Sequence, residues 1–135
     1  MTETAELVAK IPMCAELTDE QIRWIADLAT EFDVPAGFVL IEHGQPGSGM
    51  FIITDGTISI ELPRGAIERG PGEFVGELAL LADGFTRVAR VRAKTTVKGL
   101  AISRMAFFEL LEREPRVAVR MLPVLARRLA EAETT

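Results

Sequence analysis

The most informative part of the sequence is the segment GEFVGELALL at residues 72–81, followed by RVA at residues 87–89. Gly72 and Gly76 allow the backbone to turn tightly and to expose amide N–H groups. The apolar residues from Leu78 onward predict a short helix directly after the second glycine. Because the first N–H groups of a helix have no partner within it, the segment predicts a backbone site for an anion.

The strand expected after this segment places a cation beside small apolar residues. Alternate residues of a strand share a face: the predicted interior face holds Arg87, Ala89, Val91, Ala93 and Thr95, and the solvent face holds Val88, Arg90, Arg92 and Lys94. A guanidinium among apolar neighbours needs an anionic partner, and its fork fits phosphate oxygens. Glu77 can accept hydrogen bonds from sugar hydroxyls. The residues predict a sugar-phosphate pocket; a structural ion pair of Arg87 with Glu73 or Glu77 is the open alternative.

Short strand-like runs separated by turn residues fill the middle of the chain, residues 34–103. Asp55-Gly56 gives the sharpest turn signal and predicts a two-residue type I′ hairpin. Many short strands at this spacing favour an antiparallel sandwich or barrel over a parallel sheet. The predicted strands are residues 38–41, 50–54, 57–62, 66–68, 88–95 and 97–102.

Helical patterns flank the strands. Residues 17–32 predict the first helix, because Thr18 and Gln21 have the spacing of a capping box and apolar residues recur at helical intervals up to Phe32. Residues 105–112 and 115–132 predict two further helices. Pro115 suits a first helical position, and Pro123 is expected to kink the last helix. We expect its arginines to face solvent: Arg116, Arg120, Arg127 and Arg128.

The composition restricts the class of function. A net charge of −5 argues against a general nucleic-acid binder. A single histidine, His43, leaves too few ligands for a cupin-type metal enzyme, so we expect no catalysis, no metal and no cofactor. One cysteine, Cys14, cannot form an internal disulfide, which together with the absence of a signal-peptide pattern predicts a cytoplasmic protein. No apolar run reaches the roughly 20 residues that span a bilayer, so no membrane contact is expected.

The run FVGELALL at residues 74–81 with RVA at 87–89 resembles the phosphate-binding cassette of cyclic-nucleotide-binding domains. The resemblance covers nearly the whole chain, because VPAG at 34–37, GQPG at 44–47 and DG at 55–56 fall where that family has its turns. VRAKT at 91–95 looks like the catabolite activator branch.

The resemblance implies one domain over residues 1–135, mainly β with flanking helices. A helical segment with one N-terminal helix is expected at 1–33. An antiparallel double-stranded β-helix, or jelly-roll barrel, is expected at 34–103, with the cassette at 72–90. Two C-terminal helices are expected at 104–135.

The resemblance also implies how the ligand is held. Arg87 is expected to bind the cyclic phosphate and Glu77 the ribose 2′-hydroxyl, with backbone amides completing the cradle. Val88 lacks the hydroxyl associated with cyclic GMP, so cyclic AMP is favoured, with cyclic GMP as the second candidate. The expected ligand-binding residues are Gly76, Glu77, Leu78, Ala79, Arg87, Val88 and Ala89.

A sensor of this kind is expected to pass ligand binding to its C-terminal helices and to act on an effector protein. No helix-turn-helix segment follows, so no contact with nucleic acid is expected from this chain alone. Relatives in the activator branch imply a homodimer through residues 115–130, with Val117, Met121 and Val124 in the interface. The alternative is a degenerate domain that keeps the fold as a protein-interaction or dimerisation module without nucleotide, since no aromatic residue follows Phe108 to cap a base.

Overall fold

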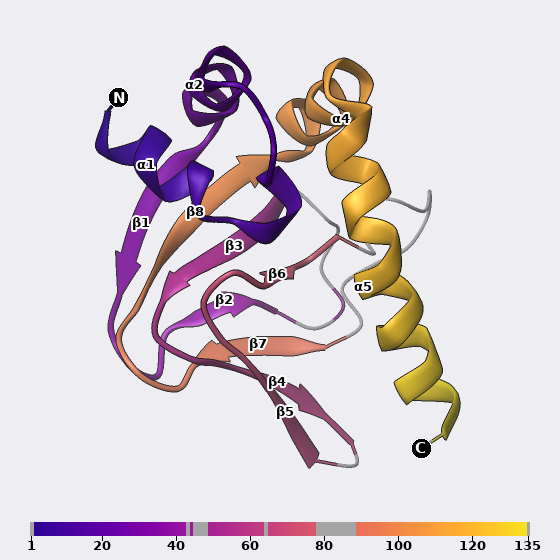
Figure 1. Cartoon of the computed structure of the whole chain (residues 1–135). Helices are drawn as coiled ribbons and strands as arrows, with labels where there is room; N and C mark the ends of the chain where they lie inside the picture. Colours follow the sequence, from indigo (N-terminus) through magenta and orange to yellow (C-terminus); the bar gives the residue numbers. More distant parts are fainter. Residues whose placement is uncertain (1, 43, 45–48, 64, 78–88, 135) are drawn as a thin grey trace.

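The computed structural model describes residues 2–42, 44, 49–63, 65–77 and 89–134, with side chains up to residue 131. Helix α1 (Glu3–Ala9), the 3₁₀ turn η1 (Pro12–Cys14) and α2 (Asp19–Leu28) precede the strands, and α4 (Arg104–Arg113) and α5 (Pro115–Thr134) follow them (Figure 1). The strands are β1 (Thr30–Val34), β2 (Val39–Ile41), β3 (Gly49–Asp55), β4 (Ile58–Leu62), β5 (Gly65–Arg69), β6 (Phe74–Val75), β7 (Arg90–Ala93) and β8 (Val97–Ser103).

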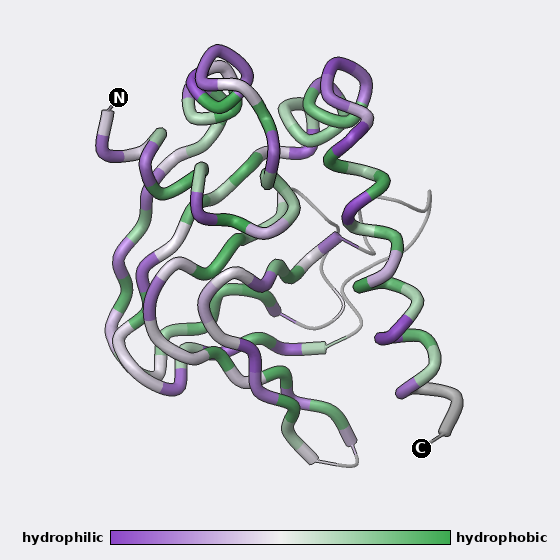
Figure 2. Tube along the Cα trace, viewed as in Figure 1, coloured by the Kyte–Doolittle hydropathy of each residue, from purple (hydrophilic) through white to green (hydrophobic). Residues whose placement is uncertain are grey.

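Two antiparallel four-stranded sheets form the centre, with strand orders β1-β8-β3-β6 and β2-β7-β4-β5. One apolar core lies between the two sheets, where Ile53 and Val97 of the first sheet meet Val91 of the second. A second core lies between the other face of the first sheet and the helices, where Ile52 and Leu100 pack with helical residues. Figure 2 shows hydrophobic positions along both the strands and the helices. The predicted fold class, antiparallel β with flanking helices, is confirmed.

The outer face of the second sheet carries the charged residues that alternation predicted to face solvent, and they form ion pairs there. Ala89, Val91 and Ala93 are buried. Their outward neighbours pair with acidic residues of adjacent strands and loops: Arg90 with Glu42, Arg92 with Glu61, and Lys94 with Glu68. The alternation ends at Thr95, which is exposed because β7 ends at Ala93.

The first helical region differs from its prediction. The capping box is present, since the Thr18 hydroxyl accepts from the Gln21 N–H and the Gln21 side chain accepts from the Thr18 N–H. The helix nevertheless ends at Leu28, and residues 30–34 form β1 paired with β8. Phe32 lies opposite Gly99 and packs edge-on against Phe51, with ring centroids 5.6 Å apart. This pairing with distant strands outweighs the local helical spacing, and α1 and η1 were not predicted.

The turn at Asp55-Gly56 is not a type I′ hairpin. Gly56 has a φ of 90°, but Asp55 does not have a positive φ. β3 and β4 belong to different sheets, so the turn carries the chain from one sheet to the other. A Cβ on Gly56 would collide with the carbonyl oxygen of Thr96, which makes glycine necessary both for the backbone conformation and for the space.

The last two helices lie close to their predicted bounds. Pro115 is the first residue of α5, and α5 continues through Pro123 as one helix. Val117 and Met121 are buried in the helical core, at 0% and 2% exposure, so the dimer interface predicted for them is wrong. Arg113 of α4 lies over the ring of Trp24, 4.2 Å from its centroid, which ties α2 to the C-terminal helices. Within the described part of the chain, we find no helix with the length and apolarity of a membrane span.

Cys14 lies in the same helical core, at 1% exposure. Burial raises the pKa of its thiol from 9.0 to about 11, an effect only partly offset by the positive charge of Arg120. The thiol is therefore neutral at physiological pH and packs as a small apolar side chain.

We expect Gly56→Ala to lower the free energy of unfolding by about 3 kcal/mol, because the new methyl group meets backbone in a left-handed conformation. Gly37→Ala is the matched control: Gly37 has a φ of 91° but nothing within 4 Å of an added Cβ. It should cost only about 1 kcal/mol, for the backbone conformation alone. Urea unfolding of both variants measures the difference, and equal losses would contradict the packing argument.

Candidate functional site

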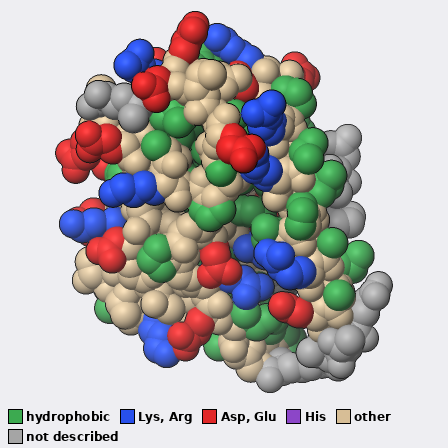
Figure 3. Space-filling view, viewed as in Figure 1, with side chains coloured by type: hydrophobic (Ala, Val, Ile, Leu, Met, Phe, Trp, Pro, Cys, Tyr) green, Lys and Arg blue, Asp and Glu red, His purple; other side chains and the backbone are tan. Residues whose placement is uncertain are grey.

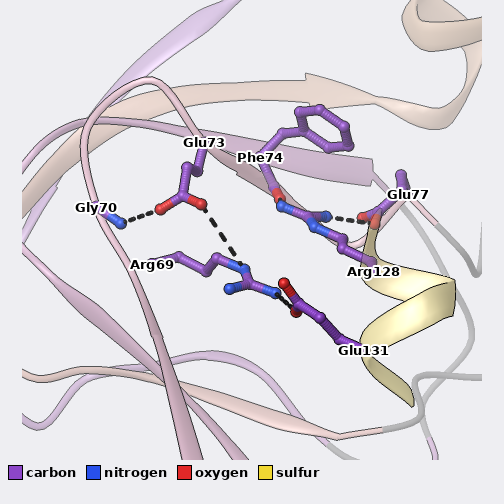
Figure 4. A network of polar contacts seen from close by, with 7 residues as sticks. All are labelled: Arg69, Gly70, Glu73, Phe74, Glu77, Arg128 and Glu131. Carbon is purple, nitrogen blue, oxygen red and sulfur yellow. Dashed lines mark hydrogen bonds and ion pairs between the residues drawn. The ribbon is translucent and has the colours of Figure 1, made fainter. Parts of the chain in front are cut away.

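The described start of the cassette is anchored to β3. The Gly72 N–H donates to the Ile53 carbonyl at 2.7 Å, and the Ile53 N–H donates to the Glu73 carbonyl at 2.9 Å. β6 then pairs with β3, and Gly76 turns the chain with a φ of 93°. This turn places the next residue, Glu77, beside helix α5 (Figure 4).

Glu77 is a buried carboxylate, with only 4% of the residue exposed. Its Oε1 accepts a hydrogen bond of 2.6 Å from Nη1 of Arg128 on α5. Nη2 of the same guanidinium donates to the Phe74 carbonyl at 2.7 Å, and its carbon lies 4.6 Å from the centre of the Phe74 ring. The short contacts are typical of charge-assisted hydrogen bonds. Arg128 therefore joins the last helix to both ends of the Phe74–Glu77 turn.

The sequence analysis missed Arg128, which it assigned to solvent. The signal that could have found it is the spacing of Val117, Met121, Val124 and Arg128, which places them on one side of an α-helix. Val117 and Met121 are buried, and Val124 packs against the same core. An arginine that continues a buried stripe needs an anionic partner, and Glu77 provides it.

A second set of charges lies beside this pair. Arg69, the last residue of β5, lies 3.9 Å from Glu73 and 3.9 Å from Glu131 of α5. Glu73 also accepts a hydrogen bond of 2.6 Å from the Gly70 N–H. Figure 4 shows these groups converging between β5, the cassette start and α5. Basic and acidic groups alternate in this cluster, which we call the α5 charge cluster: Arg69, Glu73, Glu77, Arg128 and Glu131.

The structure describes only some of the predicted ligand residues. Gly76 and Glu77 end the described first part of the cassette, and Ala89, 6% exposed, begins the second part just before β7. Leu78, Ala79, Arg87 and Val88 lie outside the described residues. The alternative partners proposed for Arg87 have ion pairs elsewhere: Glu73 with Arg69, and Glu77 with Arg128.

The described part of the site offers hydrogen-bonding groups to a polar ligand. Among the described residues, no group of three or more His, Cys, Asp or Glu side chains could hold a metal ion. Glu77 presents carboxylate oxygens next to a glycine turn, where a hydroxyl donor could be bound. The same carboxylate accepts a hydrogen bond from Arg128 of α5.

Comparison with known proteins assigns the fold to a family. The family model of the cyclic nucleotide-binding domain matches residues 31–114. The chain is 36% identical over 113 residues to a cyclic nucleotide-gated potassium channel of Mesorhizobium japonicum, covering 84% of this chain and 31% of the channel. It is 29% identical to the cAMP-activated global transcriptional regulator CRP of Salmonella typhimurium, covering 83% of this chain and 56% of the regulator.

Solved structures agree with this assignment. The catabolite activator protein of Thermus thermophilus superposes with a TM-score of 0.76 at 29% identity, covering 91% of this chain and 60% of that protein. The chain spans about a third of the length of the channel and about half that of the regulator. The matched family model covers most of the two sheets and α4, and the chain therefore belongs to the cyclic nucleotide-binding domain family.

Proposed function

We propose that this domain binds a cyclic nucleotide at the cassette and catalyses no reaction. The observation that carries the proposal is the buried Glu77 carboxylate directly after the Gly76 turn. In this proposal Glu77 accepts the ribose 2′-hydroxyl and Arg87 binds the cyclic phosphate. Backbone amides near Gly76, Leu78 and Ala89 complete the cradle, and Ala79 and Val88 line it.

We propose cyclic AMP as the preferred ligand and cyclic GMP as the weaker one. Val88 offers no hydroxyl at the position associated with cyclic GMP. The similarity to a regulator whose name states activation by cAMP supports the same choice. We propose no other cofactor, no nucleic-acid or membrane contact for this chain, and a cytoplasmic location.

The Glu77–Arg128 pair supports a relay to the C-terminal helices. Arg128 holds α5 against the cassette through two hydrogen bonds, to Glu77 and to the Phe74 carbonyl. A ribose hydroxyl that binds Glu77 shares or displaces the hydrogen bond between Glu77 and Arg128. Weakening that bond makes the present position of α5 less stable. An effector protein that contacts α5 would then sense the ligand.

The alternative is a degenerate domain that keeps the fold for protein interaction. One observation favours it: Arg128 already neutralises Glu77 in the structure, so the carboxylate is satisfied without nucleotide. The two functions differ in whether cyclic nucleotides bind at all, which titration decides.

A homodimer through α5 remains part of the proposal, with a corrected interface. Val119, Leu122 and Leu129 of α5 are 63%, 61% and 62% exposed. They follow the spacing of heptad a and d positions, with Ala126 between them, which is typical of a helix that pairs with a second helix. Hydrophobic side chains gather along this side of α5 in Figure 3. We propose that this stripe, and not Val117 or Met121, meets a second copy.

The first experiment titrates cyclic AMP and cyclic GMP by calorimetry into wild type and two cassette variants. Arg87→Ala should weaken binding by roughly 30-fold to several thousand-fold, because it leaves a buried phosphate charge unpaired. Glu77→Gln should cost less, roughly 10- to 100-fold, since the amide still accepts one hydrogen bond.

Arg92→Ala is the control, because Arg92 pairs with Glu61 on the outer sheet face, where its side chain is 38% exposed. It should leave affinity unchanged. Wild type that binds neither nucleotide would establish the degenerate alternative. Arg87→Leu tests whether Arg87 forms a structural ion pair instead. In that case the variant should lower the free energy of unfolding of the ligand-free domain and leave its nucleotide affinity unchanged.

The second experiment tests the relay with Arg128→Met. The variant should lower the free energy of unfolding by about 2 kcal/mol, below the range for a fully buried pair because the Arg128 side chain is 19% exposed. Amide hydrogen exchange of α5 should respond to cyclic AMP in wild type and respond less in the variant. An α5 whose exchange ignores the ligand in wild type would contradict the relay.

The third experiment tests the dimer by sedimentation of two neighbouring variants. Leu122→Glu should give a folded monomer, because it places a charge in the exposed stripe. Met121→Glu should unfold the domain, because Met121 is 2% exposed and a buried charge without a partner is costly. A wild-type monomer at high concentration would exclude the interface without affecting nucleotide binding.

A further inference from the structure

A pocket of about 260 Å³ lies between the N-terminal helical segment and the start of the cassette. Its walls come from three parts of the chain that are distant in sequence: α1 with η1, the end of β3, and the two residues Pro71 and Gly72. Most of the lining is apolar, with contributions from Leu7, Ile11, Pro12, Ile53 and Pro71. Gly76, Glu77 and Ala89 do not line it, so the pocket is separate from the described part of the proposed nucleotide site.

The walls of this pocket are held in place by the fold. Ile53 is buried at its floor, and its backbone is bonded on both sides. The Ile53 N–H donates to the Glu73 carbonyl at 2.9 Å, and the Gly72 N–H donates to the Ile53 carbonyl at 2.7 Å. Pro12 of η1 lies directly against Gly72, since a Cβ added to Gly72 would be 3.2 Å from the Pro12 Cδ. Such a largely preformed concave surface is typical of small-molecule sites.

The size and lining of the pocket indicate the class of ligand. An apolar cavity of roughly 150 Å³ accommodates benzene, so 260 Å³ has room for an apolar body of about six to eight carbons. Lys10 is the one charged residue among the described residues that line it. Lys10 is exposed and forms no ion pair with a described residue. A lysine can lay its carbon chain along an apolar wall and keep its ammonium in water at the mouth.

We propose that this pocket binds a small amphipathic carboxylate, whose apolar body lies between Pro12 and Pro71 and whose carboxylate meets the Lys10 ammonium and the Thr54 hydroxyl. Removal of apolar surface from water supplies most of the affinity. The exposed ammonium adds a smaller contribution, which selects an anion over a cation. This second site does not depend on whether the domain binds a cyclic nucleotide.

The test titrates hexanoate, octanoate and octylammonium into the full chain without nucleotide, and follows the assigned methyl signals by NMR. The Leu7 methyl signals should shift and saturate. Octanoate should bind roughly 10- to 15-fold more tightly than hexanoate, the gain expected for burying two further CH₂ groups. Octylammonium, with the same chain and the opposite charge, should bind at least about 3-fold more weakly than octanoate.

A lysine variant tests the charge. In Lys10→Met octanoate and octylammonium should bind equally, because the ammonium is gone and the apolar wall remains. Lys94→Met is the matched control, since Lys94 is an exposed lysine that pairs with Glu68 on the outer face of the second sheet. It should keep the wild-type preference for octanoate.

Two variants of Thr54 test the location. Phenylalanine and valine both suit a strand, so both should be compatible with β3. Thr54→Phe places a ring in the pocket and should abolish the octanoate-dependent shift of Leu7. Thr54→Val keeps the size of the side chain and should lose at most about tenfold in octanoate affinity, the loss expected for one hydrogen bond.

The wild-type titrations decide the inference even if a variant fails to fold. Saturable shifts at Leu7 with a preference for octanoate over octylammonium support it. Absence of any change at Leu7, or changes confined to Val119, Leu122 and Leu129 on α5, would overturn it, because octanoate would then bind elsewhere or not at all. Equal affinity for octanoate and octylammonium in wild type would overturn the assignment of a carboxylate ligand.

Discussion

The contact on which the candidate site depends is the ion pair of Glu77 with Arg128. A carboxylate with 4% exposure cannot remain charged at low cost without a partner, and the guanidinium of Arg128 supplies one at 2.6 Å. The two residues are 51 positions apart in the chain. Their pairing, with the second hydrogen bond of Arg128 to the Phe74 carbonyl, joins the Phe74–Glu77 turn to the second half of α5.

The two halves of α5 are held in different ways. The first sheet has an apolar core on each face, one shared with the second sheet and one with the helices. Val117 and Met121 fix the first half of α5 to the helical core, at 0% and 2% exposure. Beyond Met121, the contacts of α5 with the cassette and β5 include the polar ones of the α5 charge cluster. These charged pairs join the second half of α5 to the turn that carries Glu77 and to β5.

The solvent exposure of an ion pair decides how much it contributes to the stability of this domain. The Arg90–Glu42, Arg92–Glu61 and Lys94–Glu68 pairs are exposed on both partners, and such pairs contribute little to stability. The pairs of the α5 charge cluster involve arginines with 15% and 19% exposure. There, weaker screening by water makes each contact stronger and makes an unfilled hydrogen bond more costly. This difference is why the pairs of the cluster hold α5 in place more strongly than the outer-face pairs hold their strands.

Features that depend on neighbouring residues could be predicted from the sequence. Turn residues and strand-like runs gave the antiparallel centre, the Thr18–Gln21 spacing gave a capping box, and alternation gave the buried and exposed faces of β7. The tertiary structure decided what depends on distant partners. Pairing with β8 turned residues 30–34 into a strand, the switch between sheets replaced the hairpin expected at Asp55-Gly56, and packing on the helical core turned Val117 and Met121 inward. The partner of Arg128 belongs to this second group, because the spacing along α5 places Arg128 on the side of Val117 and Met121 but does not show that the turn carrying Glu77 lies against it. Spacing along the chain predicts which residues share a face of a helix or strand. Which other element packs against that face depends on the folded structure.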